Sequence, residues 1–258
     1  MILPFYKYNG TGNDFIMIDN RSGLFDASNT ELIRKMCTRH FGIGADGLIL
    51  LENHPDYDFR MVYFNSDGNE STMCGNGGRC IIRFAHDLKI IQNETSFIAI
   101  DGPHKGIVKN NVISLQMQDV SSVLKTDEHT ELDTGSPHYV SFMDHLPEDD
   151  FVTIARNIRR SAPYTEQGIN VNFAQTNNDQ IIMRTYERGV EDETLACGTG
   201  ATAVAIAAYH NGLIPNKSIP IQVKGGLLNV SFDTRDNQYE NIWLTGPAES
   251  VFEGKIEI

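Results

Sequence analysis

Two cysteines occur in the same local setting, and each could carry a proton in a reaction. Cys74 precedes the run Gly75-Asn76-Gly77-Gly78, and Cys197 precedes Gly198-Thr199-Gly200-Ala201. Each cysteine ends a polar loop, and a segment with helical periodicity follows it. Each sulfur is therefore predicted at a helix N-terminus, where unpaired backbone N–H groups and the helix dipole create a positive potential. Such a potential favours the thiolate over the thiol, whose ordinary pKa is about 8.5.

The same helix ends offer a binding site for an anionic group. Free backbone N–H groups bind a carboxylate readily, and glycines let it approach the backbone closely. If the two cysteines face each other across one cleft, one thiolate can remove the α-proton of an amino acid while the opposite thiol protonates the other face. The helix ends would stabilise the negative charge that develops in this step. The pattern predicts cofactor-independent inversion at Cα, with Cys74 and Cys197 as the two catalysts.

The remaining cysteines fit a simpler interpretation. A cysteine in a protein interior is usually a small hydrophobic residue, and Cys37 and Cys80 lie on predicted helices beside apolar residues. Four cysteines are too few for a disulfide scaffold in a chain of 258 residues. No Cys-x-x-Cys motif occurs, which disfavours a zinc site, and neither a metal nor another cofactor is predicted.

An internal repeat supports the symmetry of the two cysteines. Met73–Gly78 recurs as Ala196–Ala201 at an offset of 123 residues. The same gapless offset aligns four further places: Gly12-Asn13 with Gly135-Ser136, Tyr63 with Tyr186, Ser71 with Thr194, and Gly102 with Gly225. We interpret the chain as a duplicated half, which brings two equivalent cysteine sites.

Short strands and a few helices must position these sites. The strands are predicted from β-branched and aromatic runs, and they come in pairs rather than in strict alternation with helices. The expected fold class is therefore α+β, a mixed α/β arrangement. Strands are predicted at 6–8, 15–19, 48–51, 59–64, 96–100, 106–108 and 112–117, and again at 170–174, 181–186 and within 219–232. Helices are predicted near 28–41, after Cys74, near 149–160 and after Cys197.

Two of these predictions are specific enough to check in detail. The first helix opens with Ser28 and Glu31 in capping-box spacing, and its apolar face extends to Phe41. The boundary between the halves is expected within Gln118–Thr134, a polar stretch with little apolar periodicity.

Composition restricts the classes of partner. The 21 basic and 34 acidic residues give a net charge of −13, and such a surface repels phosphate backbones, so nucleic acid is an unlikely partner. No apolar run reaches the ~18 residues of a membrane span, and no signal peptide begins the chain. We expect a cytoplasmic protein that acts on a small molecule.

Six longer motifs of the chain resemble those of a known protein family. They are Lys7–Phe15, Arg39–Gly47, Tyr63–Gly68, Met73–Cys80, Tyr186–Val190 and Ala196–Ala201. In this order, and over nearly the whole chain, the sequence resembles the diaminopimelate epimerases. The two Cys-Gly segments alone would also fit proline racemases and their relatives.

The resemblance implies a fold and a reaction. The fold is two pseudo-symmetric halves, each with strands wrapped around a central helix, with the active-site cleft between them. Residues 1–118 together with the returning strand 246–258 would form the half that carries Cys74, and residues 119–245 the half that carries Cys197. The reaction implied is interconversion of LL- and meso-2,6-diaminopimelate, without pyridoxal phosphate or metal, in lysine and cell-wall synthesis. A homodimer is implied by the resemblance only.

The resemblance also assigns roles to individual residues. Cys74 and Cys197 are the bases. The carboxylate at the reacting end is held by backbone N–H groups of Gly75, Asn76, Gly198 and Thr199. The distal carboxylate is bound by Asn65, Asn170 and Arg188, and the distal ammonium by Glu187. Asn13 also lines the site. His138 and Glu187 are placed near the cysteines and adjust the pKa values of their thiols. Arginine suits a carboxylate through its paired donors, and an acid suits an ammonium.

Taken singly, these residues have ordinary alternatives. Asparagines in turns often bond only to the backbone, and Glu187-Arg188 fits an exposed charge pair. Two positions depart from the family pattern, Ser136 in place of an asparagine and Gly47 in place of a frequent glutamine, and both affect only the distal end. The alternatives are a related racemase for histidine or proline, a non-catalytic amino-acid binding module, and a pyridoxal-phosphate racemase, for which no distinctive lysine motif is present.

Overall fold

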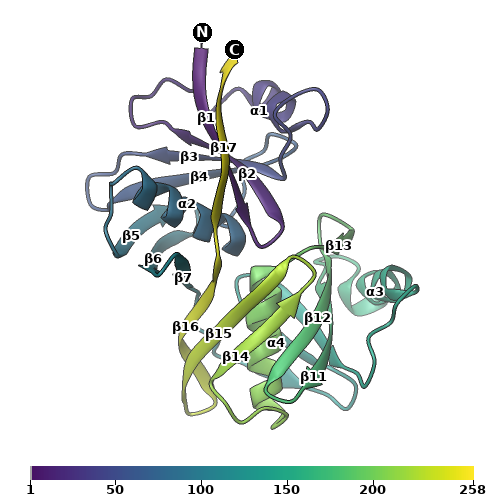
Figure 1. Ribbon diagram of the computed structural model, residues 1–258. Helices are drawn as coiled ribbons and strands as arrows, with labels where there is room; N and C mark the ends of the chain where they lie inside the picture. The colour runs from purple at the N-terminus through teal and green to yellow at the C-terminus, as the bar shows by residue number, and fades with distance from the viewer. Residues whose placement is uncertain (1) are drawn as a thin grey trace. The chain divides into compact units, whose positions relative to one another are not determined.

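The computed structural model describes residues 2–258, and the chain in it divides into two compact units (Figure 1). The first unit runs to Leu115 and includes Gly246–Ile258, and the second is Gln116–Thr245. No helix within residues 2–258 is both long and apolar enough to span a membrane.

The first unit is a continuous ladder of strands packed around one helix. Neighbouring strands run in the order β17, β1, β2, β3, β4, β5, β6, β7, and all pairs are antiparallel except β2–β3 and β4–β5, which are parallel. The elements are β1 (Ile2–Gly10), β2 (Asn13–Asp19), α1 (Thr30–Cys37), β3 (Gly47–Glu52), β4 (Phe59–Asn65), α2 (Gly75–Asp87), β5 (Glu94–Ala99), β6 (Gly102–Lys109), β7 (Val112–Gln116) and β17 (Glu249–Glu257).

The second unit repeats this plan with the same strand directions. Its ladder runs β8, β9, β10, β11, β12, β14, β15, β16, with β10–β11 and β12–β14 as the parallel pairs. The elements are β8 (Val123–Lys125), β9 (Thr130–Asp133), β10 (Pro137–Phe142), α3 (Phe151–Arg159), the 3₁₀ turn η1 (Ala162–Tyr164), β11 (Asn170–Asn177), β12 (Gln180–Glu187), β13 (Asp192–Thr194), α4 (Gly198–His210), β14 (Ser218–Val223), β15 (Gly226–Arg235) and β16 (Gln238–Pro247).

Strand register confirms the duplication and the mixed α/β class. Phe15 pairs with Gly47 in the parallel pair β2–β3, and His138 pairs with Asn170 in β10–β11, which is the same pairing at an offset of 123. The two central helices, α2 and α4, each have 13 residues and begin directly after a cysteine. The two halves therefore share one architecture and the same register in this parallel strand pair.

The offset of 123 residues between the two halves does not hold at β12, the long strand that precedes the second cysteine. Phe64 pairs with Leu48, whereas Val171, the equivalent of Leu48, pairs with Tyr186. Tyr186 therefore takes the place of Phe64 rather than of Tyr63. The connection from this strand to the cysteine is one residue longer in the second unit, and this extra residue restores the offset at Cys197.

The hairpin turn that follows each central helix shows a second shift. Ala99 pairs with Gly102 at the end of β5–β6, and Val223 pairs with Gly226 at the end of β14–β15. Both glycines have positive φ angles, +120° and +145°, which other residues rarely adopt. The counterpart of Gly102 is therefore Gly226, and the match to Gly225 was wrong by one residue.

The composition of α4 explains its position. It is apolar on all sides, and Ala201–Ala208 is buried without interruption. A helix without a polar face must be covered on every side, and α4 contacts β9, β10, β11, β12, β14 and β15 (Figure 1). The strands therefore fix the position of the helix and of the cysteine at its N-terminus.

Two of the detailed predictions are corrected. Helix α1 is capped by Asn29, whose Oδ1 accepts from the Leu32 N–H at 3.0 Å, because Ser28 Oγ donates to Asp26 instead. The helix ends at Cys37, so Phe41 is 87 % exposed and is not part of the apolar face. The polar stretch Gln118–Thr134 holds two short strands, β8 and β9.

We predict that shortening a buried side chain of the central helix α2 lowers the free energy of unfolding far more than shortening an exposed side chain on the edge strand β17. Phe84 of α2 is fully buried, with ring centroids 5.0 Å from Tyr6 and 5.6 Å from Tyr8. Phe84→Ala should lower the free energy of unfolding by ~3–5 kcal/mol. The control is Phe252→Ala on β17, where the ring is 48 % exposed and the change should stay within about 1 kcal/mol. Urea denaturation measures both, and equal losses would contradict the assigned packing.

Candidate active site

Cys74 is the N-cap residue of α2. Its backbone is extended, with φ −91° and ψ 131°, its carbonyl oxygen accepts from the Gly78 N–H at 2.7 Å, and its side chain is partly exposed. The sulfur is therefore at the end of the helix where backbone N–H groups point outward, as the sequence predicted. No acidic residue occupies the first turn, so the positive end of the helix dipole is not neutralised there.

A chain of side-chain amides lies beside Cys74 and leads to a charged cluster. Asn76 is fully buried, and its Nδ2 donates to Asn13 Oδ1. Asn13 Nδ2 in turn donates to Asp46 Oδ2 at 3.0 Å. Asp46 pairs with Arg39 at 3.0 Å. The structure thus brings Asn13 and Asn76 together, and the ion pair fixes the orientation of both amides.

Arg79 is a buried charged residue of α2 that sequence reasoning did not identify. It is fully buried, and its guanidinium donates to the Gly75 carbonyl at 3.2 Å and to Asn76 Oδ1 and Thr11 Oγ1 at 2.9 Å each. Burial lowers its pKa to about 10, and negative charge on the thiols of Cys80 and Cys74 would raise that pKa. A signal existed in the sequence, because this arginine shares the buried face of a predicted helix with apolar residues.

Cys197 caps α4 in the same way. Its backbone is extended, with φ −124° and ψ 114°, and its carbonyl oxygen accepts from the Ala201 N–H. Its sulfur accepts from the Gly200 N–H at 3.4 Å and lies 3.4 Å from Thr199 Oγ1, and the residue is 6 % exposed. Thr134 Oγ1 donates to the Thr199 carbonyl at 2.9 Å and holds this turn in place.

The floor beneath the second helix start is polar. Asn172 is fully buried, with its Nδ2 donating to the Tyr139 carbonyl at 3.0 Å and its Oδ1 accepting from Thr185 Oγ1 at 2.9 Å. A Cβ placed on Gly200 would lie 2.7 Å from Asn172 Oδ1, so this position requires glycine. Neither Asn172 nor Thr185 was identified from the sequence, although an asparagine within an apolar strand was a usable signal.

His138 is fully buried between two asparagines. Its Nδ1 lies 3.0 Å from Asn172 Nδ2, and its Nε2 lies 3.4 Å from Asn170 Nδ2. The shorter contact makes Nδ1 the acceptor and assigns the proton of the neutral ring to Nε2. Burial, reinforced by the positive charge of Arg188, lowers the pKa of His138 from 6.5 to about 3. A neutral His138 acts on its neighbours by hydrogen bonding rather than by charge.

A second group of predicted residues meets at the ends of β10, β11 and β12. Asn170 Nδ2 donates to Ser136 Oγ at 2.9 Å, and its Oδ1 accepts from the Arg188 N–H at 2.8 Å. The Arg188 guanidinium donates to the Gln167 carbonyl at 2.9 Å and to Ser136 Oγ at 3.3 Å. Ser136, the departure from the family pattern, therefore holds Asn170 and Arg188 together.

Glu187 and Asn65, the remaining predicted site residues, lie at strand ends. Glu187, half-buried at the end of β12, accepts from Thr194 Oγ1 at 3.0 Å. Asn65 is exposed at the end of β4, where its backbone bonds to the Asn69 carbonyl. Within residues 2–258, no three His, Cys, Asp or Glu side chains are grouped to hold a metal ion.

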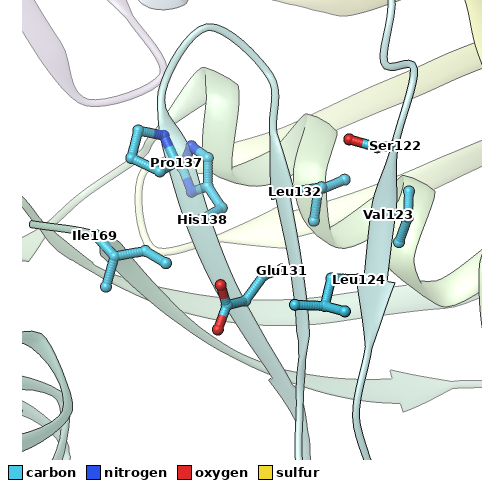
Figure 2. A pocket seen from close by; sticks show the side chains of 8 residues that line it. All are labelled: Ser122, Val123, Leu124, Glu131, Leu132, Pro137, His138 and Ile169. Atoms are coloured by element: carbon cyan, nitrogen blue, oxygen red, sulfur yellow. The ribbon is translucent and has the colours of Figure 1, made fainter. Parts of the chain in front are cut away.

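A cavity of about 370 Å³ opens beside His138 in the second unit (Figure 2). Ser122, Val123, Leu124, Glu131, Leu132, Pro137, His138 and Ile169 line it. Figure 2 shows Pro137 and His138 at the start of β10, next to the side chains of β8 and β9. Of the predicted site residues, only His138 lines this cavity, so it is not the predicted carboxylate site at Cys197.

Relatives of known family resemble this chain over its full length. The family model of diaminopimelate epimerase matches residues 5–119 and 130–251, one match for each half. The diaminopimelate epimerase of Flavobacterium psychrophilum is 56 % identical over 256 residues, which are 98 % of this chain and all of the relative. That of Chlorobaculum tepidum is 42 % identical over 260 residues, or 97 % of this chain and all of the relative.

Solved structures at low sequence identity share the fold. A PhzF-family phenazine biosynthesis protein of Bacillus anthracis has a TM-score of 0.76 at 13 % identity and covers all of both chains. A hydroxyproline epimerase of Agrobacterium vitis has a TM-score of 0.69 at 12 % identity, covering 99 % of this chain and 92 % of its own. These likenesses show a common architecture, while the family follows from the sequence matches. The chain belongs to the diaminopimelate epimerase family and is an isomerase of the epimerase type.

Proposed function

We propose that this protein interconverts LL- and meso-2,6-diaminopimelate by proton transfer at one Cα, with Cys74 and Cys197 as the two acid/base groups. One thiolate takes the α-proton, which leaves a carbanion stabilised by the neighbouring carboxylate, and the other thiol delivers a proton to the opposite face. The proton gained and the proton given balance, so no oxidant or cofactor is required. The pathway would be synthesis of lysine and of cell-wall precursors.

The observation that carries the proposal is the equivalence of the two cysteine caps. Each cysteine has an extended backbone and precedes a central helix of 13 residues, and the parallel strand pairs of the two units have the same register. A structural cysteine gains nothing from being repeated at the polar end of a helix. Two proton carriers that must treat opposite faces of one carbon alike require such a repeat.

The choice of a two-headed substrate rests on Arg188. In the second unit its guanidinium donates to Ser136 Oγ and to the Gln167 carbonyl, its backbone N–H donates to Asn170 Oδ1, and among the described residues no carboxylate pairs with it. A guanidinium and an amide held side by side match the two oxygens of a distal carboxylate. Half-buried Glu187, which follows Tyr186 on the same strand, suits the distal ammonium. A racemase for histidine or proline would have no use for this second set.

The assembly state remains a prediction from the resemblance. We propose a homodimer, and the exposed Val251 and Phe252, neighbours on β17, supply an apolar surface for a second copy to cover. The cytoplasmic location is likewise a prediction from the sequence.

We predict that Cys74→Ser and Cys197→Ser each reduce inversion by about 10²–10⁴-fold, because a hydroxyl is too weak a base at neutral pH. The measurement is deuterium uptake at Cα from D₂O by metal-free protein, with the isomer ratio followed by chromatography. Cys37→Ala is the control, because Cys37, the last residue of α1, is buried in the hydrophobic core. Near-normal inversion by either serine variant would exclude the two-base mechanism, and absence of exchange in the wild type would favour a binding module.

We predict that Arg188→Met lowers kcat/KM for diaminopimelate, because the distal carboxylate loses a charged partner. The loss should correspond to an activation free energy that is higher by ~2–5 kcal/mol. kcat should fall as well as KM rise, since remote contacts help to reach the transition state. Arg235→Met, whose side chain is 78 % exposed in the same unit, is the matched control. If the wild-type protein inverted proline or histidine but did not react with diaminopimelate, the proposed substrate would be refuted. The proposed two-cysteine mechanism would still stand.

We predict an acid-labile contribution of His138 to stability. Its pKa is lowered from 6.5 to about 3 in the folded protein, so the unfolded chain binds a proton in this range while the folded protein does not. Stability should therefore fall with falling pH below 6.5, by up to about 1.4 kcal/mol per pH unit from this group. His138→Gln should flatten the slope of unfolding free energy between pH 6 and 4, and the exposed His145→Gln should not. Parallel slopes for all three proteins would show that His138 does not titrate as described.

A further inference from the structure

Arg79 is a buried cation without an anionic partner among the described residues. Its bonds go to a backbone carbonyl, an amide oxygen and a hydroxyl, at Gly75, Asn76 and Thr11. Its Nε, also buried, has no hydrogen-bond acceptor. The nearest carboxylate along its hydrogen bonds is Asp46, which is reached only through two uncharged amides. A buried guanidinium in this position is costly unless a negative charge comes close to it.

Two ionisable groups act on Arg79, the thiols of Cys80 and Cys74. Cys80 is completely buried, and burial raises its pKa to about 12, so it stays protonated at neutral pH. Cys74 is partly exposed and caps the helix, and the Gly75 carbonyl that Arg79 contacts belongs to the next residue. Cys74 is therefore the group that can supply the missing negative charge.

Other charges on the elements around α2 already have partners. Lys7 on β1 lies 2.7 Å from Asp14 on β2, and Arg39 lies 2.6 Å from the same carboxylate and 3.0 Å from Asp46. These two cations and two anions balance within their own cluster. At the far end of α2, Arg83 pairs with Asp87.

The second unit has no such cation. The position equivalent to Arg79 is Thr202, which is fully buried and donates to the Gly198 carbonyl at 3.0 Å. Beneath Gly200 lies the uncharged Asn172, whereas the equivalent Gly77 faces the apolar side chain of Ile49. The two halves therefore share their backbone geometry but differ by one full charge at the cysteine.

We propose that Arg79 is the buried counter-cation of Cys74, so that the resting enzyme holds Cys74 as the thiolate and Cys197 as the thiol. This inference rests on the proposed function and deepens it, since two-base inversion needs one base and one acid before the substrate arrives. Arg79 is a positioning residue that acts through Cys74. The enzyme is then prepared to deprotonate one stereoisomer, and the opposite direction requires the proton to be redistributed first.

Site-resolved alkylation of the wild-type protein tests the charge state without any substitution. Iodoacetamide is applied briefly between pH 5 and 10 in the absence of substrate, and peptide mass spectrometry gives the modified fraction of each cysteine. The midpoint pH for Cys74 should lie about one unit or more below that for Cys197, as expected for a thiol beside an unpaired cation. Midpoints, rather than rates, are compared, because Cys197 is less exposed. A lower or equal midpoint for Cys197 overturns the proposal.

Substitution of the arginine tests its cause. Arg79→Met should raise the Cys74 midpoint by about 1–3 pH units and slow alkylation at pH 7 by about tenfold or more. Arg79→Lys should retain part of the effect, and the helix-surface control Arg83→Met should change nothing. The Cys197 midpoint should be constant in all four proteins. A purely structural role would change the high-pH plateau of both cysteines and leave the Cys74 midpoint in place, which would refute the proposal. If the methionine variant fails to fold, the lysine variant and the wild-type comparison decide.

These measurements are separate from the test of the proposed function. Expected midpoints without deuterium uptake from diaminopimelate would leave the charge asymmetry standing and refute the substrate. Normal inversion with reversed midpoints would refute only the role of Arg79.

Discussion

Each half of this protein depends on one physical constraint. Its central helix must be buried among strands, although the first turn of that helix has to remain polar. α2 and α4 are covered by strands, yet the N–H groups of their first turns have no partners within the helix. A cysteine as cap, followed by glycines, leaves the first turn of α2 without a side-chain cap, and it caps the first turn of α4 only through the weak acceptor sulfur of Cys197, 3.4 Å from the Gly200 N–H. The strand ladder, the glycine at Gly200 and the register at β10–β11 all serve to hold that one turn in place.

The two halves meet this constraint in different ways. In the first, a cation from the helix itself, Arg79, lies beneath the turn, and apolar side chains such as Ile49 fill the floor. In the second, the helix has the uncharged Thr202 at this position, and neutral His138 and Asn172 lie on the neighbouring strands. Gene duplication preserves backbone register more strictly than the chemistry beneath it, because register is fixed by many hydrogen bonds and each supporting side chain by only a few.

Sequence reasoning predicted the features that depend on local pattern. The cysteine caps, the two central helices, most strands and the duplication follow from periodicity and spacing, and the structure confirms them. It failed where two local partners compete, as at Asn29 against Ser28, and where one residue is added between repeats, as before Cys197. It missed Arg79 and Asn172 because the value of a buried polar residue depends on contacts far apart along the chain, such as Arg79 with Thr11.

The pairing of β1 with β17 sets an order for biosynthesis. β1 forms the start of the chain, but its partner strand, Glu249–Glu257, follows the whole of the second unit. The second unit is one uninterrupted segment and has all its strands once Pro247 has left the ribosome, whereas one edge of β1 has no strand beside it until Glu249–Glu257 emerges. Until then, the backbone donors and acceptors on that edge of β1 can pair with any other extended chain. The half that is translated first is therefore completed last, and a nascent chain that stalls before Glu249 exposes an unpaired strand edge on β1.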